Sequence, residues 1–409
     1  MLNERSARRR LLPFDAVPSL IGSVRIGPVR FRLLAKHCGF GVCLAAVVNL
    51  SNTETVKTFG IVGTGVIGSG WASRALALGW DVVAWDPAPG AEARMRVAVT
   101  RAWPSLQRLG MSADASLDRL RFVATLDELG AVCDFIQENA PENLELKQSL
   151  HAQLSAVTPV HVVIGSSTSG LLPTDMQRDM VAPERLVVGH PFNPVYLLPL
   201  VEVVAGKQTS PDSIAQAMDV YRSLGMHALH VRNEIEGFLT DRLQEALWRE
   251  ILHIVNDGVA TTDELDQSIV YGPGLRWAAM GTNLIYHLAG GEAGMRHMLE
   301  QFGPALELPW TKLVAPKLND TLIDRMVEGT QAQAAGRSIA ELEAMRDEYL
   351  IDVMEALERR GLSAGLTLRH HRELTGTPTA ETFTGVVATN GEPTVVTDRH
   401  GKRYRLEAL

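Results

Sequence analysis

The chain has 409 residues, 46% hydrophobic and 21% charged, a balance typical of a globular protein with two or three domains. A formal net charge of −8 excludes a nucleic-acid-binding surface that extends over the whole chain, and no segment is apolar for long enough to span a membrane. The three cysteines, Cys38, Cys43 and Cys133, form neither a disulfide framework nor a zinc-binding CxxC pair, which favours a reducing cytoplasm and predicts no metal site.

Residues 1–55 differ in composition from the rest of the chain. Eight basic side chains precede Glu54, against only two acidic ones, and an apolar run covers residues 38–50. Thirteen residues at 1.5 Å each are too short to cross about 30 Å of hydrocarbon. The region is either a targeting segment or a disordered extension outside the fold, and the poor cleavage-site pattern favours the extension.

A dinucleotide-binding pattern opens the folded part. A predicted strand over residues 57–63 leads into Gly63-Thr64-Gly65-Val66-Ile67-Gly68 and then into a helix that ends near Gly79. Gly63 permits a tight turn, Gly65 lets a pyrophosphate approach the backbone, and Gly68 lets the helix pack closely on the strand. The free N–H groups at the helix start hold phosphates, so this turn predicts a bound dinucleotide, with an empty glycine turn as the alternative.

The next strand, over residues 81–86, identifies the nucleotide. It ends on Asp86, 18 residues after Gly68. A carboxylate at this place hydrogen-bonds the ribose diol of NAD and repels the 2′-phosphate of NADP. The sequence therefore predicts NAD as the cofactor, and FAD is disfavoured by the organisation of the rest of the chain.

Strands and helices alternate up to about residue 236. Strands are predicted at residues 122–125, 133–137, 161–165, 185–189 and 200–204, with a helix over 142–154. This is an α/β pattern, and it predicts a Rossmann-type doubly wound sheet over residues 56–236 with ligands at the carboxyl ends of the strands. An all-helical C-terminal domain is expected over residues 237–375. The tail, residues 376–409, predicts a hairpin around Asn390-Gly391 between runs 383–388 and 393–397.

Three side chains at predicted strand ends suit the oxidation of an alcohol. Ser169 follows the 161–165 strand, His190 follows the 185–189 strand, and Glu202 comes 12 residues later inside Val201-Glu-Val-Val204. A histidine can take the hydroxyl proton, a carboxylate can orient that histidine, and a serine can hold the substrate oxygen. Singly, the histidine and the serine also have structural explanations, but a glutamate flanked by valines in a buried strand needs a partner.

From Phe59 to about Thr375 the chain resembles the 3-hydroxyacyl-CoA dehydrogenase superfamily. His190 begins an H-x-F-N-P element with Glu202 at the family's spacing, and Ser169 stands 21 residues before the histidine. The resemblance implies that His190 is the base, that Glu202 orients it and that Ser169 is catalytic. It further implies cofactor contacts for Glu142, Lys147 and Asn193.

One position departs from the family pattern. The element that opens the helical domain usually reads G-F-x-x-N-R, whereas here it is Gly237-Phe-Leu-Thr-Asp241-Arg242. An ionised Asp241 accepts hydrogen bonds but donates none, so the usual donor near the substrate carbonyl is missing. An anion at this place suits a different substrate.

Within the superfamily the residues around His190, Asp86 and Ser169 are most similar to the carnitine-oxidising branch. This similarity implies that the substrate is L-carnitine, oxidised to 3-dehydrocarnitine, and that the protein is a homodimer. Aromatic faces recognise trimethylammonium groups, Asp241 adds a negative charge, and Arg242 can pair with a carboxylate. The candidate aromatic residues are Phe192, Tyr196, Trp277, Tyr286 and Trp310, each with packing in the core as the alternative.

Other functions remain open at this point. The same machinery serves 3-hydroxyacyl-CoA or L-gulonate dehydrogenases, although the helical domain shows no obvious basic cluster for the CoA phosphates. A crystallin-like NAD-binding protein without catalytic activity is a hypothesis of another class, disfavoured by the intact set of Ser169, His190 and Glu202.

Overall fold

The computed structural model describes residues 19–26, 29–38, 41–48, 58–278, 281–290, 292, 294–313, 319–322, 324, 325, 327, 334–377, 395–397 and 403–405. The chain divides into two compact units, residues 1–55 and residues 56–409.

The first unit holds a three-stranded antiparallel sheet, β1 (Ser19–Ile26), β2 (Val29–Cys38) and β3 (Gly41–Val48), in the order β1-β2-β3. The expectation that residues 1–55 are a disordered extension stays a prediction. The three strands are rich in β-branched and other apolar residues, which favour pairing in extended conformation. They belong to a unit of their own, apart from the fold that begins with the glycine turn.

The second unit is built on an eight-stranded sheet in the order β11-β10-β9-β8-β7-β4-β5-β6. Its strands are β4 (Thr58–Val62), β5 (Asp81–Trp85), β6 (Leu120–Phe122), β7 (Phe135–Glu138), β8 (Val163–Ser166), β9 (Leu186–Pro191), β10 (Leu200–Ala205) and β11 (His227–Val231). Six neighbouring strands of this sheet, β6, β5, β4, β7, β8 and β9, run parallel to one another, as the predicted Rossmann-type fold requires. β10 runs antiparallel to β9, and β11 runs parallel to β10.

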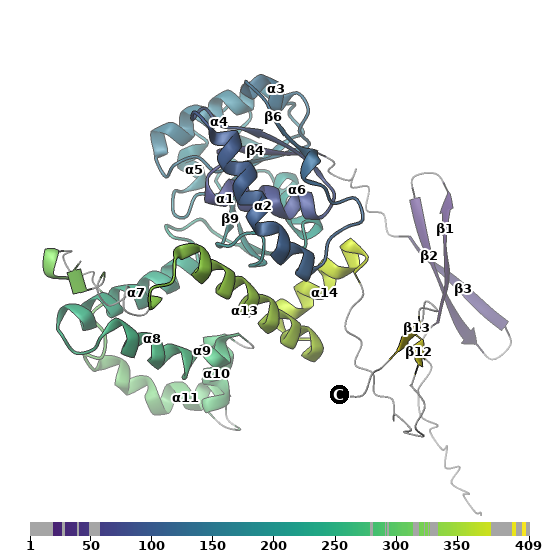
Figure 1. The fold of residues 1–409 in the computed structure, drawn as a ribbon. Helices are drawn as coiled ribbons and strands as arrows, with labels where there is room; N and C mark the ends of the chain where they lie inside the picture. Colours follow the sequence, from purple (N-terminus) through teal and green to yellow (C-terminus); the bar gives the residue numbers. More distant parts are fainter. Residues whose placement is uncertain are drawn as a thin grey trace, which may run out of the picture. The chain divides into compact units, whose positions relative to one another are not determined.

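Helices cover both faces of this sheet (Figure 1). One face carries α1 (Val66–Ala77), α2 (Ala91–Leu109) and α6 (Pro211–Ser223), packed around the buried aromatic rings of Phe59, Trp71 and Tyr221. The other carries α3 (Leu126–Gly130), α4 (Leu144–Val157) and α5 (Pro173–Met176), packed on the opposite side chains of the same strands. The inner strands β4, β8, β9 and β10 bury nearly all of their residues on both faces, and those residues are mostly apolar.

A helical region follows, as predicted. It comprises α7 (Thr240–Asn256), α8 (Thr262–Val270), α9 (Gly274–Trp277), α10 (Thr282–Ala289), α11 (Gly294–Phe302), α13 (Ile339–Arg360) and α14 (Ser363–Thr375). Capping boxes begin two of these helices, Thr261 with Glu264 at α8 and Ser338 with Glu341 at α13. Across the described residues, every helix is too short or too polar to be a membrane-spanning segment.

The tail contains a short two-stranded ladder. β12 (Val395–Thr397) pairs antiparallel with β13 (Arg403–Arg405). The expected strand at residues 383–388 and the turn at Asn390-Gly391 lie outside the described residues. In the register of this ladder Val396 stands opposite Tyr404.

Candidate active site

The glycine turn has the geometry that a phosphate site requires. Gly63 adopts a positive φ of 84°, and a Cβ on Gly68 would lie 2.0 Å from the carbonyl oxygen of Gly63, so only glycine fits there. A Cβ on Gly65 would meet nothing within 4 Å, which leaves the backbone open to a ligand. Val66 and Ile67 form the first turn of α1, where backbone N–H groups lack intrahelical partners.

Asp86 lies just past the end of β5 and beside this turn. Its Oδ2 accepts hydrogen bonds from the backbone N–H of Thr64 at 2.8 Å and from the Thr64 hydroxyl at 2.9 Å. Beyond it opens a hollow of about 500 Å³, lined among others by Gly90, Arg96 and Phe122. The carboxylate of Asp86 is therefore placed to bind the adenosine ribose of NAD, and the hollow beyond it has room for the adenine.

His190 and Glu202 stand opposite each other on β9 and β10. The Nδ1 of His190 lies 3.0 Å from Oε2 of Glu202, and the two residues are only 5% and 0% exposed. Because a carboxylate only accepts, Nδ1 carries a proton toward Glu202, and Nε2 is the ring nitrogen that remains for a ligand. β10 is antiparallel, so it starts at the same sheet edge where β9 ends. This direction places Glu202 directly beside His190.

The other carboxylate oxygen of Glu202 holds the start of α7. Its Oε1 accepts from the backbone N–H groups of Leu239 and Thr240 at 3.1 and 3.0 Å, and from the Thr240 hydroxyl at 3.1 Å. Burial raises the pKa of Glu202, but hydrogen bonds from His190 and Thr240 outweigh burial and the net pKa is lowered. Glu202 is therefore an anion that joins the base to the helical region.

Asp241, in the first turn of α7, faces the other ring nitrogen of His190. Its Oδ2 lies 3.5 Å from Nε2. Burial raises the pKa of Asp241, the positive charge of a protonated His190 opposes that rise, and the charges of Glu202 and Glu245 add to it. The rings of Phe192 and Phe238 complete the surroundings of His190, with centroids 4.7 and 5.6 Å away.

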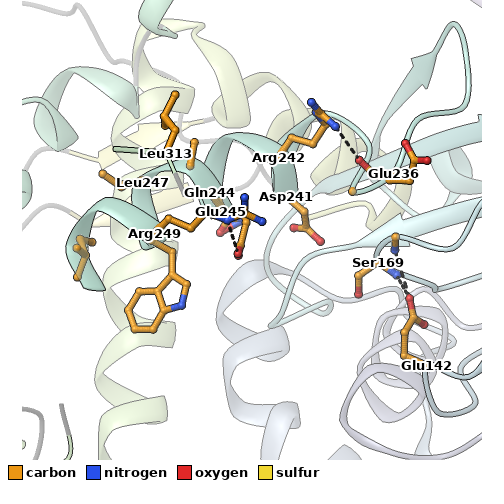
Figure 2. A pocket seen from close by; sticks show the side chains of 15 residues that line it. Glu142, Ser169, Glu236, Asp241, Arg242, Gln244, Glu245, Leu247, Arg249 and Leu313 are labelled. Atoms are coloured by element: carbon orange, nitrogen blue, oxygen red, sulfur yellow. Dashed lines mark hydrogen bonds and ion pairs between the residues drawn. The ribbon is translucent and has the colours of Figure 1, made fainter. Parts of the chain in front are cut away.

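Ser169 reaches the site on a loop that Glu142 organises. The Oε1 of Glu142 accepts from the Thr168 hydroxyl at 2.5 Å and from the backbone N–H groups of Ser169 and Gly170 at 3.0 and 3.2 Å. Ser169 and Asp241 line one open pocket of about 1030 Å³. Figure 2 shows Ser169 with Glu142 behind it on one side of this pocket and Asp241 on the helix across from it.

The other predicted residues divide into two groups. Arg242 lines the pocket and donates to the backbone oxygen of Glu236 at 3.4 Å, while Asn193 is exposed just after β9. Lys147 is 1% exposed, donates to Glu138 at 2.8 Å and lies 3.8 Å from Glu142, and its contact with the cofactor stays a prediction.

Two predicted substrate contacts are not brought to the pocket. The hydroxyl of Tyr196 donates to Asp347 of α13 at 2.5 Å, because the chain after Asn193 turns into the packing between α2 and α13. Trp277 lies on α9 and does not line the pocket. Neither Tyr196 nor Trp277 is among the residues that line this pocket, and their contact with the substrate stays a prediction.

Sequence reasoning missed several pocket residues on α7. Gln244, Glu245 and Trp248 line the pocket together with Asp241. The spacing of three, four and seven residues places them on one face of the helix, and this periodicity was the available signal. Glu245 pairs with Arg249 at 3.0 Å, whereas the carboxylate of Asp241 faces Nε2 of His190.

Comparison with known proteins agrees with this geometry. The family models for the NAD binding domain and the C-terminal domain of 3-hydroxyacyl-CoA dehydrogenase match residues 58–235 and 237–334. An L-carnitine dehydrogenase of Pseudomonas putida is 60% identical over 312 residues, which is 76% of this chain and 97% of that protein. One of Bacillus cereus is 53% identical over 319 residues, 78% of this chain and 98% of that protein.

A solved structure with a related sequence has the same architecture. It is 5-formyl-3-hydroxy-2-methylpyridine 4-carboxylic acid 5-dehydrogenase, an NAD+-dependent dismutase, which is 28% identical to this chain. The match has a TM-score of 0.63 and covers 74% of this chain and 99% of that protein.

Proposed function

The chain belongs to the 3-hydroxyacyl-CoA dehydrogenase family, and from this membership we propose that it oxidises the C3 hydroxyl of L-carnitine to 3-dehydrocarnitine with NAD. The observation that carries the choice of substrate is the carboxylate of Asp241 beside Nε2 of His190. The L-carnitine dehydrogenases at 53–60% identity support the same choice.

In the proposed reaction His190 is the general base. Its Nε2 takes the proton of the C3 hydroxyl while the hydrogen on C3 leaves with its electron pair, and the C3–O bond becomes a carbonyl. NAD supplies the hydride acceptor when it is bound at the Gly63–Gly68 turn. Glu202 holds Nδ1–H and stabilises the imidazolium that forms, and Ser169 positions the hydroxyl from across the pocket.

Recognition of the ammonium group is assigned to Asp241. In carnitine the quaternary nitrogen is two single bonds from C3, a separation of about 2.5 Å. With the hydroxyl on Nε2 of His190, the nitrogen comes close to the Asp241 carboxylate, which is 3.5 Å from that same Nε2. Two opposite charges at about 4 Å, partly shielded from water, attract each other appreciably. Phe192 adds an aromatic ring beside the base.

The alternative substrates suit the pocket less well. Its lining contains four carboxylates against the two arginines Arg242 and Arg249, an acidic excess that disfavours the phosphates of a CoA ester. L-Gulonate carries a carboxylate and no cation, so it gains nothing from Asp241.

The experiment is NADH formation at 340 nm with L-carnitine, D-carnitine, 3-hydroxybutyryl-CoA and L-gulonate in parallel. We expect turnover with L-carnitine alone, and a His190→Ala variant that binds NADH but has lost activity by about a thousandfold or more. Turnover of the CoA ester or the sugar acid instead would replace the substrate. Near-full activity of His190→Ala would remove the proposed base, and silence on all four with tight NADH binding would favour a non-catalytic protein.

We also propose that the protein works as a homodimer in the reducing cytoplasm. Large apolar side chains are exposed along the helical region, among them Leu243, Tyr271 and Trp310 at 72–81%. Cys133 is buried as a free thiol. Light scattering coupled to size exclusion would give the mass of two chains, and a monomer at micromolar concentration would refute the dimer.

A further inference from the structure

A buried carboxylate close to the site has no role in the reaction described above. Glu138 is the last residue of β7 and is 0% exposed. Its Oε1 accepts from Lys147 at 2.8 Å and from the backbone N–H of Ala140 at 2.5 Å. Its Oε2 accepts from the Ser166 hydroxyl at 2.6 Å and from Nε2 of His151 at 3.0 Å. A buried carboxylate is costly unless it is paired, so four donors on one group indicate that its charge is needed here.

These donors keep Glu138 ionised. Burial raises the pKa of Glu138, but the hydrogen bond from His151 and the charge of Lys147 overcome it, and the pKa falls to about 2. The group therefore stays negative throughout the neutral and mildly acidic range.

Lys147 is shared between this buried carboxylate and a second one at the pocket. Its Nζ lies 2.8 Å from Oε1 of Glu138 and 3.8 Å from Oε2 of Glu142, and the Lys147 side chain is only 1% exposed. The Glu142 side chain is 44% exposed. The position of the ammonium group thus follows its closer, buried partner, and Glu142 is attracted to a cation whose place is already set.

Glu142 in turn holds the loop of Ser169. One oxygen faces Lys147 while the other receives the Thr168 hydroxyl and the N–H groups of Ser169 and Gly170. If Glu138 lost its charge, Lys147 would remain as a buried cation with Glu142 as its nearest carboxylate. The stronger pull would draw Glu142 toward Nζ and away from the loop amides.

The same segment also lies against the predicted cofactor turn. A Cβ on Gly63 would meet the backbone of Asn139 at 2.8 Å and the nitrogen of Ala140 at 3.0 Å. Because Glu138 binds that Ala140 nitrogen, it anchors the cofactor side and the Ser169 side of the site to one buried group.

We propose that Glu138 is a positioning residue, which acts through Lys147 and Glu142 to fix the Ser169 loop beside the cofactor turn. The proposal rests on the proposed function only in taking Ser169 as the residue that positions the substrate hydroxyl.

The test is a double-mutant cycle with Glu138→Gln and Glu142→Gln. Each single variant should lower kcat about tenfold. If Glu138 acts through Glu142, adding Glu138→Gln to Glu142→Gln should lower kcat by less than about threefold further. If the loss of kcat in the double variant equals the product of the two single losses, the proposal is overturned, because Glu138 then acts independently of Glu142.

Ser166→Ala is the matched control, because it removes a hydrogen bond from the same carboxylate on the side away from Lys147. Its thermal stability should fall while its kcat stays within about twofold. An equal loss of kcat in Ser166→Ala would reduce Glu138 to a structural role. If Glu138→Gln does not fold, Glu142→Gln serves as the test, because the Glu142 side chain is 44% exposed and its replacement should not disturb the fold. Full activity of Glu142→Gln would refute the proposed chain of contacts.

This design tests the proposed substrate and the proposed role of Glu138 separately. If the unmodified protein oxidises another alcohol of the panel instead of L-carnitine, the cycle is run with that alcohol. The ratio between the variants then tests Glu138 whether or not carnitine is the substrate.

Discussion

His190 and Glu202 face each other across the single antiparallel pairing of the eight-stranded sheet, with Nδ1 and Oε2 3.0 Å apart. The pair does two things at once. One oxygen of Glu202 fixes the tautomer of the base, while the other holds the N-terminal turn of α7, which carries Asp241. The position of Asp241 relative to the base is therefore determined by the carboxylate that orients the base.

Glu202→Gln should lower kcat by about a hundred- to ten-thousandfold. The amide removes the negative charge that stabilises the imidazolium, and it can present its N–H₂ to Nδ1, which favours the wrong tautomer. NADH binding, followed by fluorescence, should stay within about threefold because the glycine turn is untouched. A variant with normal kcat would show that His190 needs no carboxylate partner.

Asp241→Asn should lower kcat/KM for L-carnitine about 10- to 100-fold, because it removes a charge near the quaternary nitrogen without changing the shape of the site. The neutral analogue 3-hydroxy-5,5-dimethylhexanoate, which replaces that nitrogen with carbon, is the control. Its kcat/KM should be low with the unmodified protein and change by less than about threefold in the variant. Equal losses on both compounds would refute the ion contact.

The same carboxylate predicts a pH effect on substrate binding. Because the pKa of Asp241 is raised by burial, protonation begins at a higher pH than for an ordinary aspartate. As the pH falls, the contact with the cation is lost and KM for L-carnitine should rise. In Asp241→Asn this rise should be absent, and its persistence would assign it to another group.

Gly65→Ala and Gly68→Ala form a pair that separates ligand binding from packing. A Cβ on Gly68 would lie 2.0 Å from the Gly63 carbonyl oxygen, so this variant should lose about 3 kcal/mol or more of unfolding free energy. Gly65 has an ordinary φ of −65° and open space around its Cβ direction, so Gly65→Ala should keep its Tm within a few degrees. Its NADH affinity should nevertheless fall at least tenfold, since the methyl group occupies the approach of the phosphates. Comparable thermal melts for the two variants would contradict the assignment.

The predictable parts of the site are those that local spacing encodes. The glycine turn, Asp86 and the His190–Glu202 pair all follow from short intervals in the sequence at strand ends. The direction of β10 could not be predicted from sequence because a strand of valines pairs equally well in either direction, and only the tertiary connection decides.

The contacts of individual side chains were harder to predict from sequence than the strands. Tyr196 is six residues from His190, yet it binds Asp347 on α13, which is remote in sequence. Trp248 was overlooked as a pocket residue, because on an amphipathic helix an aromatic side chain resembles a core residue until the partner of that face is known. Glu138 was not predicted as a functional residue, because nothing near it in the sequence indicates that it accepts four hydrogen bonds.

The burial of His371 leads to a prediction of how the free energy of unfolding depends on pH. It is 1% exposed on α14, and its Nε2–H donates to the carbonyl of Gly110 at 2.7 Å. Burial first, and then the charge of Arg74, lower its pKa to about 4 from the ordinary 6.5. The unfolded chain therefore binds this proton at a higher pH than the folded protein does. The associated stability is fully present above about pH 6.5 and is lost as the pH falls to about 4.

The full loss amounts to about 3 kcal/mol, and urea denaturation at pH 7, 6, 5 and 4.5 would measure how much of it is reached. His371→Gln keeps a donor for the Gly110 carbonyl but cannot take up a proton, so its stability should fall less than that of the unmodified protein over this range. Glu138, with its pKa of about 2, is an internal reference. Its contribution is lost only below about pH 4.5, and it should remain in the His371→Gln variant. Parallel pH profiles for the two proteins would show that His371 is not the group that destabilises the fold in mild acid.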